Sequence, residues 1–206
     1  MTAILGTTCI AVANDDYQAW ASLDKKLYSQ GPFTLSFYTE VRLREEGHQA
    51  FGYFFGPRVQ YRIKKYLAVG GAAKMIHFKG SGSGFARLQR YEGEATFNFK
   101  LAPRFSYAHR NRYEYIRREA GANSERWRSR IRFTVPVKGT RLVNKFFFGN
   151  EFFYDLRNGN FTENRIVPIG AGLKTNSKVS CSIYYLIQDS RSSSSNNHVL
   201  GTALSF

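Results

Sequence analysis

The stretch RWRSRIRFTVPV, residues 126–137, places an arginine at every second position over its first half. These arginines are Arg126, Arg128, Arg130 and Arg132. The alternate positions hold Trp127, Ser129, Ile131, Phe133, Val135 and Val137. Because successive side chains of a β-strand point to opposite faces, this pattern predicts a strand with one cationic face and one largely apolar face.

The same two-residue period recurs along most of the chain. The segment FTLSFYTEVRLRE, residues 33–45, alternates apolar with polar side chains throughout. That is long for a strand of a soluble protein, which usually has about five or six residues. Segments 91–101, 104–117 and 178–188 repeat the pattern, and no stretch with helical period is longer than a turn or two. The sequence therefore predicts an all-β protein.

Composition narrows the class of protein. The 206 residues include 30 Lys+Arg and 15 Asp+Glu, a formal net charge of +15, together with 18 Phe and 13 Tyr. No segment approaches the roughly 18–20 consecutive apolar residues of a membrane-spanning helix, which excludes a helical membrane protein. Turn-like separators such as GSGSG, LAPR, KGTR and RNGN stand between the alternating segments, with no linker that would divide the chain into two domains.

Two barrel types could use strands with one charged and one apolar face. A soluble barrel buries the apolar faces, whereas a membrane barrel turns them to lipid and its polar faces to the lumen. Strand length favours the membrane barrel, because a bilayer takes about 9–11 tilted residues per strand. Aromatic enrichment favours it too, since Tyr and Trp gather at the two membrane interfaces. We therefore expect the arginines of residues 126–132 to line the lumen.

Both ends of the chain agree with export to an outer membrane. Residues 1–13 are mostly small and apolar and end in an Ala-Val-Ala pattern, which predicts a truncated signal peptide before a barrel formed by residues 14–206. The last residues, HVLGTALSF, place Leu200, Leu204 and Phe206 on one face. This ending resembles the signal that the insertion machinery of bacterial outer-membrane barrels reads. The expected partners are that machinery and membrane lipid, with anionic lipid phosphates at the barrel rims.

Four like charges on one strand face require carboxylates on the neighbouring strands. Counting back from LAPR as a tight turn sets Glu94 near Arg110 or Arg112, and Glu92 near Arg112. Counting from the next loop sets Glu114 by Arg128 or Arg130, and counting from KGTR sets Glu151 opposite Arg128. The predicted lumen charge network comprises Glu40, Arg42, Arg44, Glu92, Glu94, Arg110, Arg112, Glu114, Arg126, Arg128, Arg130, Arg132 and Glu151.

Several blocks of the chain together resemble a known family. The blocks are QAWASLDKKL, EVRLR, RNRYEY, RWRSRIRF, GNEFFYDL, ENRIVPIGAG and NHVL, from about Trp20 to the C-terminus. In this order they resemble the bacterial outer-membrane family catalogued as domain of unknown function 2490. The resemblance implies an outer-membrane barrel and no established activity. Only the Arg and Glu positions named above carry over, as lumen residues and not as catalytic ones.

The number of strands follows from the loops. With the C-terminus in the periplasm, long loops lie outside and short turns inside, as bacterial barrels prefer, which gives about ten strands from near Phe33. Segment 17–30 would be a further strand, and an even count requires that it does not span or that another strand is added. We predict a single antiparallel transmembrane barrel of about ten to twelve strands.

Three classes of function remain open. The first is a structural barrel or narrow pore of the bacterial outer membrane, which would favour anions because of its positive lumen. The second is a lipid-modifying barrel enzyme with a Ser/His pair, for which the histidines are His48, His77, His109 and His198. The third is a soluble nucleic-acid binder, which the interleaved carboxylates disfavour. We expect no catalytic residues, metal, cofactor or nucleic-acid partner, because no motif for them is present.

Overall fold

The structure is a computed structural model, and it describes residues 15–80, 84–175, 179–191 and 196–206. The predicted signal peptide, residues 1–13, lies outside the described residues. Residues 81–83, 176–178 and 192–195 lie outside them as well.

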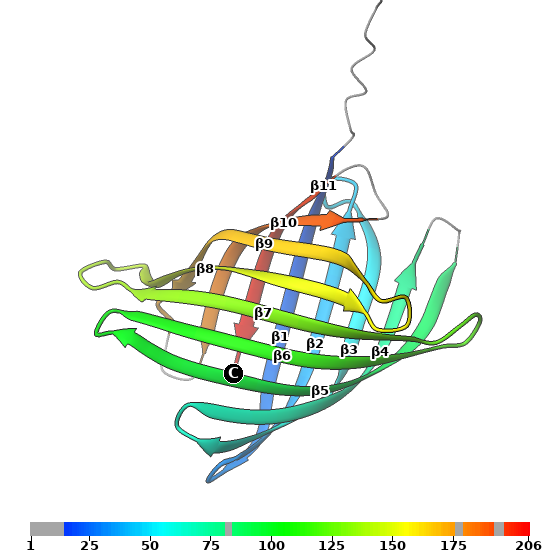
Figure 1. Ribbon diagram of the computed structural model, residues 1–206. Coiled ribbons are helices and arrows are strands. Elements are labelled where there is room, and N and C mark those ends of the chain that lie inside the picture. The colour runs from blue at the N-terminus through cyan, green and yellow to red at the C-terminus, as the bar shows by residue number, and fades with distance from the viewer. Residues whose placement is uncertain (1–14, 81–83, 176–178, 192–195) are drawn as a thin grey trace, which may run out of the picture.

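The described residues form a closed barrel of eleven β-strands, in which each strand pairs with two neighbours (Figure 1). They contain no helix, and so none that is long and apolar enough to cross a membrane. The strands are β1 (Asp16–Gln30), β2 (Phe33–Arg44), β3 (Gln49–Lys64), β4 (Leu67–Lys79), β5 (Phe85–Ala102), β6 (Phe105–Arg118), β7 (Ser124–Pro136), β8 (Val143–Asp155), β9 (Asn160–Leu173), β10 (Ser180–Ser190) and β11 (Asn196–Ser205). The all-β barrel is confirmed, and its strand number lies inside the predicted range.

The expectation of a purely antiparallel barrel with an even strand count is wrong. Segment 17–30 does belong to a full strand, β1, which lies between β2 and β11. Neighbouring strands along the chain run in opposite directions, so an odd number of them leaves the first and last strand running the same way. β1 and β11 therefore close the barrel as its one parallel pair, from Asp16↔Asn197 to Asp24↔Ser205.

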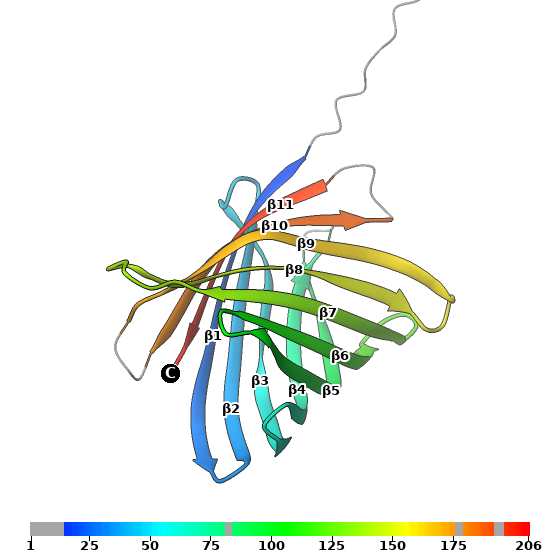
Figure 2. The same cartoon turned by 60° about the vertical axis from the view of Figure 1, so that its left-hand side comes forward.

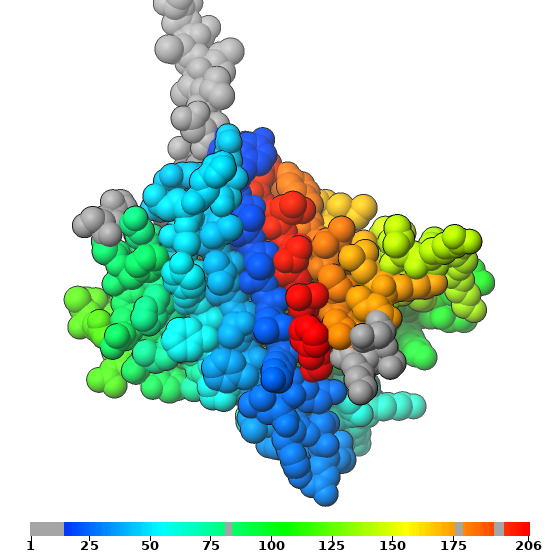
Figure 3. All heavy atoms as spheres, turned by 180° about the vertical axis from the view of Figure 1, so that it is seen from behind, coloured from blue at the N-terminus to red at the C-terminus, as the bar shows by residue number. Residues whose placement is uncertain are grey.

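This parallel pair also fixes the C-terminus. Figure 3 shows the blue β1 and the red β11 side by side along the wall of the barrel. Beyond the paired residues, the Lys26 amide donates to the Phe206 carbonyl at 2.9 Å, and the Phe206 amide donates to the Asp24 carbonyl at 3.1 Å. The last residue of the chain is thus part of the closing ladder. β1 begins at the end of the barrel opposite the C-terminus (Figure 1).

The strands twist strongly, and glycines make room for aromatic side chains inside the barrel. Figure 2 shows β1 to β4 running steeply while β5 to β9 cross more flatly, as expected for one continuous twisted sheet. At Gly201 an added Cβ would meet the Tyr184 ring at 2.1 Å, and at Gly170 it would meet the Phe147 ring at 2.3 Å. Each ring therefore lies across the glycine of a neighbouring strand, a packing that also stabilises designed sheets.

A tight turn joins β2 to β3. β2 continues to Arg44, and β3 begins at Gln49. Glu45 and Glu46 make this tight turn with positive φ angles of 54° and 57°, a conformation that non-glycine residues rarely adopt. On the opposite end of the barrel, Gly31 with φ of 56° turns β1 into β2.

Candidate functional site in the barrel lumen

The β7 strand separates its two faces as its alternation predicts. Arg128 is buried at 7% exposure, whereas its neighbour Trp127 is 42% exposed on the outside of the barrel. Arg130 and Arg132 line a cavity inside the barrel. The arginines of residues 126–132 thus share the inner face of β7.

Glu114 is the most buried carboxylate of the interior. It lies on β6 with 0% exposure. Its oxygens lie 2.5 Å from Arg126 Nε, 2.5 Å from Arg128 Nη1 and 3.4 Å from Arg112 Nη1. The expected contact with Arg128 is present, but the expected register is wrong, because Glu114 is opposite Arg126. Pairing of β6 with β7 starts at Ile116↔Ser124. The connection between the two strands is therefore centred earlier in the chain than the count assumed.

Glu151 on β8 forms ion pairs with two arginines, one of which, Arg128, also contacts Glu114. The Glu151 oxygens lie 2.8 Å from Arg110 Nη2 and 2.9 Å from Arg128 Nη2. The sequence placed Glu151 opposite Arg128, whereas the structure places it opposite Arg130. Pairing of β7 with β8 begins at Pro136↔Lys145, so it is centred one position beyond the centre of KGTR. Arg128 still reaches Glu151, diagonally across the ladder.

Glu92 and Glu94 on β5 complete the central part of the network. Glu94 is opposite Arg112 and lies 2.6 Å from its Nη2. Glu92 is opposite Glu114, not Arg112, but it still approaches Arg112 Nη1 to 3.1 Å. Cations from β4 and β5 also contact Glu92: Lys74 Nζ at 3.0 Å and Arg90 Nε at 2.7 Å. Carboxylates and guanidiniums of four neighbouring strands thus form one network, in which several ion pairs run diagonally between strands.

The three predicted residues of β2 divide between the lumen and its rim. Glu40 and Arg42 form an ion pair at 2.6 Å, and the Arg42 guanidinium lies 3.8 Å from the centre of the Trp20 ring. Arg44 lies at the rim, where it donates to Gln49 at 2.8 Å and contacts Glu45 at 3.8 Å. Arg44 thus makes no ion pair with the carboxylates of the lumen charge network in the described chain.

Several members of the interior were missed by the sequence analysis. Arg58, Lys74, Arg90 and Arg165 all line the cavity. The register of the strands would have identified them as interior residues, because Lys74 is opposite Arg90 and Arg165 is opposite Glu151. The pairing of residues was predicted only across the turns that join β5 to β8. Strands β3, β4 and β9 therefore contributed no residue to the predicted network.

Aromatic rings form part of the interior, although the sequence analysis placed apolar side chains outside. Phe153 has 0% exposure. The guanidiniums of Arg128 and Arg165 lie 4.3 Å and 4.6 Å from its ring centre. A guanidinium over an aromatic face is attracted electrostatically and keeps its edge free for carboxylates. The ring of Phe153 therefore stabilises the guanidiniums of Arg128 and Arg165.

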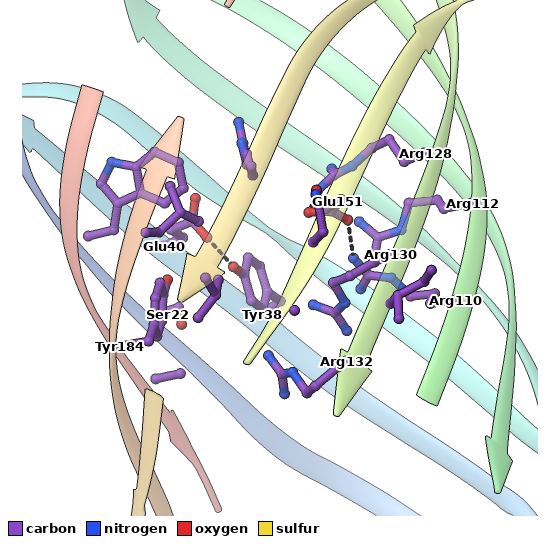
Figure 4. Close-up of a pocket in the computed structure, with 18 of the residues that line it drawn as sticks. Ser22, Tyr38, Glu40, Arg110, Arg112, Arg128, Arg130, Arg132, Glu151 and Tyr184 are labelled. Carbon is purple, nitrogen blue, oxygen red and sulfur yellow. Dashed lines mark hydrogen bonds and ion pairs between the residues drawn. The ribbon is translucent and has the colours of Figure 1, made fainter. Parts of the chain in front are cut away.

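The centre of the barrel holds a cavity of about 280 Å³. Arg130 and Arg132 reach into it from β7, on the side that faces Tyr38 (Figure 4). Two carboxylates line it, Glu40 and Glu151, against many more cationic side chains. Within the described part of the chain, no three His, Cys, Asp or Glu side chains come together as metal ligands.

The outer face is rich in large apolar side chains. The residues of the predicted insertion signal all lie there, with Leu200 at 63% exposure, Phe206 at 47% and Leu204 at 38%. Two rows of aromatic residues also cross neighbouring strands on this face. One row consists of Tyr113, Trp127, Tyr154 and Phe161, and the other of Phe99, Tyr107, Phe133 and Phe148.

His48 lies in the turn between β2 and β3, and no histidine of the described residues lines the charged cavity. His109 and His198 lie on the outer face. His109 Nε2 lies 2.9 Å from Ser129 Oγ, between the two aromatic rows. Where β1 begins, His198 Nε2 hydrogen-bonds Asp15 Oδ2 at 3.1 Å while its Nδ1 contacts the Tyr185 hydroxyl. The hydrogen bond from His198 lowers the pKa of Asp15 below its ordinary value of 3.8. This contact ties the beginning of β1 to β11.

Comparison with known proteins gives one match. The model of a family described as "Protein of unknown function (DUF2490)" matches residues 17–199, which runs from β1 to the beginning of β11. No curated protein and no solved structure matches.

Proposed function

Because the chain belongs to the family described as "Protein of unknown function (DUF2490)", we propose a function from the geometry of its barrel. The protein is a membrane-spanning barrel of the bacterial outer membrane. Its lumen is narrowed by the charge network to a path that favours anions. The observation that carries this proposal is the inverted polarity of the barrel, with ionised side chains inside and large apolar side chains outside.

The inversion is clear when the two faces are compared. Buried charged residues include Lys74, Arg112, Glu114 and Glu151, whereas large hydrophobic side chains are exposed on every strand of the wall. A barrel surrounded by water would place these groups the other way round, because exposed apolar area is unfavourable in water. A barrel surrounded by lipid needs an apolar outside and tolerates charges only inside.

Strand length and the aromatic rows support the same proposal. The strands have 10 to 18 residues, and about 9–11 tilted residues cross a bilayer. On β7 the two aromatic rows are separated by Ser129 and Ile131, which lie between Trp127 and Phe133 on the outer face. Two aromatic girdles with a band between them are typical of barrels in outer membranes.

The barrel end that carries the C-terminus has a basic rim. Exposed cations at the turns of this end are Lys65, Arg104, Lys138 and Arg141, and the exposed Lys26 lies on β1 beside Phe206. Cations near a membrane surface are attracted to anionic lipid phosphates. We propose that this rim contacts lipid phosphates, and that the terminal strand ending in Phe206 is recognised by the insertion machinery.

Refolding and conductance measurements test this proposal. The chain should fold in detergent or lipid with β-type circular dichroism and heat-modifiable gel mobility. In planar bilayers the protein should show a small conductance. Under a salt gradient, its reversal potential should indicate anion selectivity. A folded, monomeric protein in water without detergent would contradict the membrane location. Cation preference in the bilayer would contradict the anion-favouring path alone.

A lipid-modifying enzyme is the second candidate, and the contact between His109 and Ser129 favours it. The pair lies on the outer face, where a lipid ester would be found. Serine hydrolases orient their histidine with a further group, usually a carboxylate, and among the described residues no carboxylate hydrogen-bonds His109. We therefore place this function second. Labelling of Ser129 by a fluorophosphonate probe, absent in Ser129→Ala, would favour it over a pore.

A further inference from the structure

Two arginines of the interior have no carboxylate of their own. Arg130 is opposite Glu151 in the ladder, but the Glu151 oxygens are turned to Arg110 and Arg128. Throughout the described residues, Arg130 and Arg132 form no hydrogen bond and no ion pair. Arg132 stacks on Phe147, with its guanidinium 4.5 Å from the ring centre. Both guanidiniums therefore keep their N–H donors for something else.

The residues around these two arginines add a further positive charge, and no carboxylate among the described residues of the cavity wall is left to neutralise it. Arg130 is opposite Arg110 across the β6–β7 ladder, and like charges in such positions repel each other. The two carboxylates that line the cavity, Glu40 and Glu151, are already engaged by Arg42, Arg110 and Arg128. A cation away from bulk water is unfavourable unless it is paired. The cavity thus lacks negative charge at one wall.

The cavity has room for the missing charge. Its volume of about 280 Å³ is several times that of one water molecule, about 30 Å³ in the liquid. On another part of its wall, the Tyr184 hydroxyl makes no hydrogen bond to any described residue, whereas the Tyr38 hydroxyl donates to Glu40. Figure 4 shows Arg130 and Arg132 side by side at the cavity. A small polyatomic anion with a few waters fits this space.

We propose that the cavity at Arg130 and Arg132 binds an oxyanion of the phosphate or sulfate class. The planar guanidinium presents its donors as a fork that matches two oxygens of such an anion. Two unpaired guanidiniums match a doubly charged oxyanion better than a halide, which offers one point charge and no fork geometry. The ligand is either a free inorganic anion or the phosphate group of a small solute.

This inference deepens the proposed function, since it gives the positive lumen a ligand, but its test does not depend on conduction. Binding is measured on the full chain refolded in detergent, by calorimetry with inorganic phosphate and by thermal stability with and without phosphate. A protein that binds phosphate without conducting would contradict the pore and keep the site. A conducting protein without phosphate binding would contradict the site and keep the pore.

The variants are Arg130→Gln/Arg132→Gln and, as a matched control, Arg117→Gln at the exposed end of β6. Wild type and control should bind phosphate alike and gain thermal stability from it. The double variant should bind at least roughly tenfold more weakly, since charged hydrogen bonds contribute that much or more. Folding of each variant is checked by heat-modifiable mobility. Removing unpaired cations should not prevent folding.

Further ligands distinguish the source and the class of the anion. Glycerol phosphate that binds as well as inorganic phosphate would identify the phosphate group of a solute as the ligand, and weaker binding would identify the free anion. Absence of saturable phosphate binding in the wild type would overturn the proposal. Equal binding by the Arg130/Arg132 double variant would overturn it too, and so would displacement of phosphate by equimolar chloride.

Discussion

Replacing Glu114 by glutamine should destabilise the barrel much more than the same replacement of an exposed carboxylate. The substitution keeps the size of the side chain and removes one negative charge from a position with 0% exposure. Three guanidiniums lie within 4 Å of that carboxylate. Arg112 keeps Glu92 and Glu94, and Arg128 keeps Glu151. Arg126 keeps no carboxylate at ion-pair distance among the described residues.

The expected magnitude follows from these partners. Removing one partner of a buried pair typically costs about 3–5 kcal/mol. The Arg126 side chain is 25% exposed, and water in the lumen compensates part of the loss. We therefore expect a loss near the lower end, about 3 kcal/mol, in the free energy of unfolding.

The assay is a urea titration of the protein refolded into lipid vesicles, followed by gel mobility. The matched control is Glu125→Gln, an exposed carboxylate at the start of the neighbouring strand β7 that accepts a hydrogen bond from Tyr113 at 2.8 Å. Such a surface contact contributes at most about 1 kcal/mol. Adding Arg126→Met to Glu114→Gln should recover part of the loss, because it removes the cation that was left alone. Equal losses for Glu114→Gln and Glu125→Gln would refute the reasoning.

Other changes test other parts of the barrel. Arg130→Gln, in phosphate-free buffer, should leave the free energy of unfolding unchanged or raise it, and a clear loss in the same titration would count against an unpaired guanidinium. Ile131→Arg should cost about 2–4 kcal/mol if this outer position meets lipid, and a neutral result would place it in water. Deleting Phe206 should lower the amount of folded protein in the outer membrane, measured by heat-modifiable mobility, and unchanged amounts would contradict its role. The lowered pKa of Asp15 means that its contact with His198 stabilises the start of β1 above pH 3.8, and that this stabilisation is lost as the pH falls below that value. The protection of the amides at the start of β1 against hydrogen exchange should therefore fall only under acid. Protection that persists under acid would contradict the contact.

Alternation along a strand was readable from the sequence because it is a local property of the chain. Once segment 126–137 is extended, Arg128 and Arg130 must share one face and Trp127 the other, whatever the neighbours are. The same reasoning identified the acidic residues of the interior, Glu92 and Glu114. It did not identify Phe153, which lies next to an outward phenylalanine in a run of aromatic residues, so its face depends on the register and bulges of β8.

The partner of each charge was decided by the tertiary structure alone. Register depends on the centre of each turn, and a shift of one position in the β7–β8 loop moved Glu151 from Arg128 to Arg130 in the ladder. Even the correct register does not give the ion pairs, because long side chains reach diagonally and Glu151 binds Arg110 and Arg128 instead. The unpaired state of Arg130 is therefore invisible in the sequence.

Closure of the barrel likewise required the tertiary structure. The alternating pattern of residues 16–30 is compatible with a strand, but the sequence has no feature that states which neighbour it joins. Its pairing with β11 makes the strand count odd and the closing pair parallel. Strand pairing is a contact between segments far apart in the chain, and its choice depends on how all the other strands have filled the wall, whereas alternation depends only on the geometry of one strand.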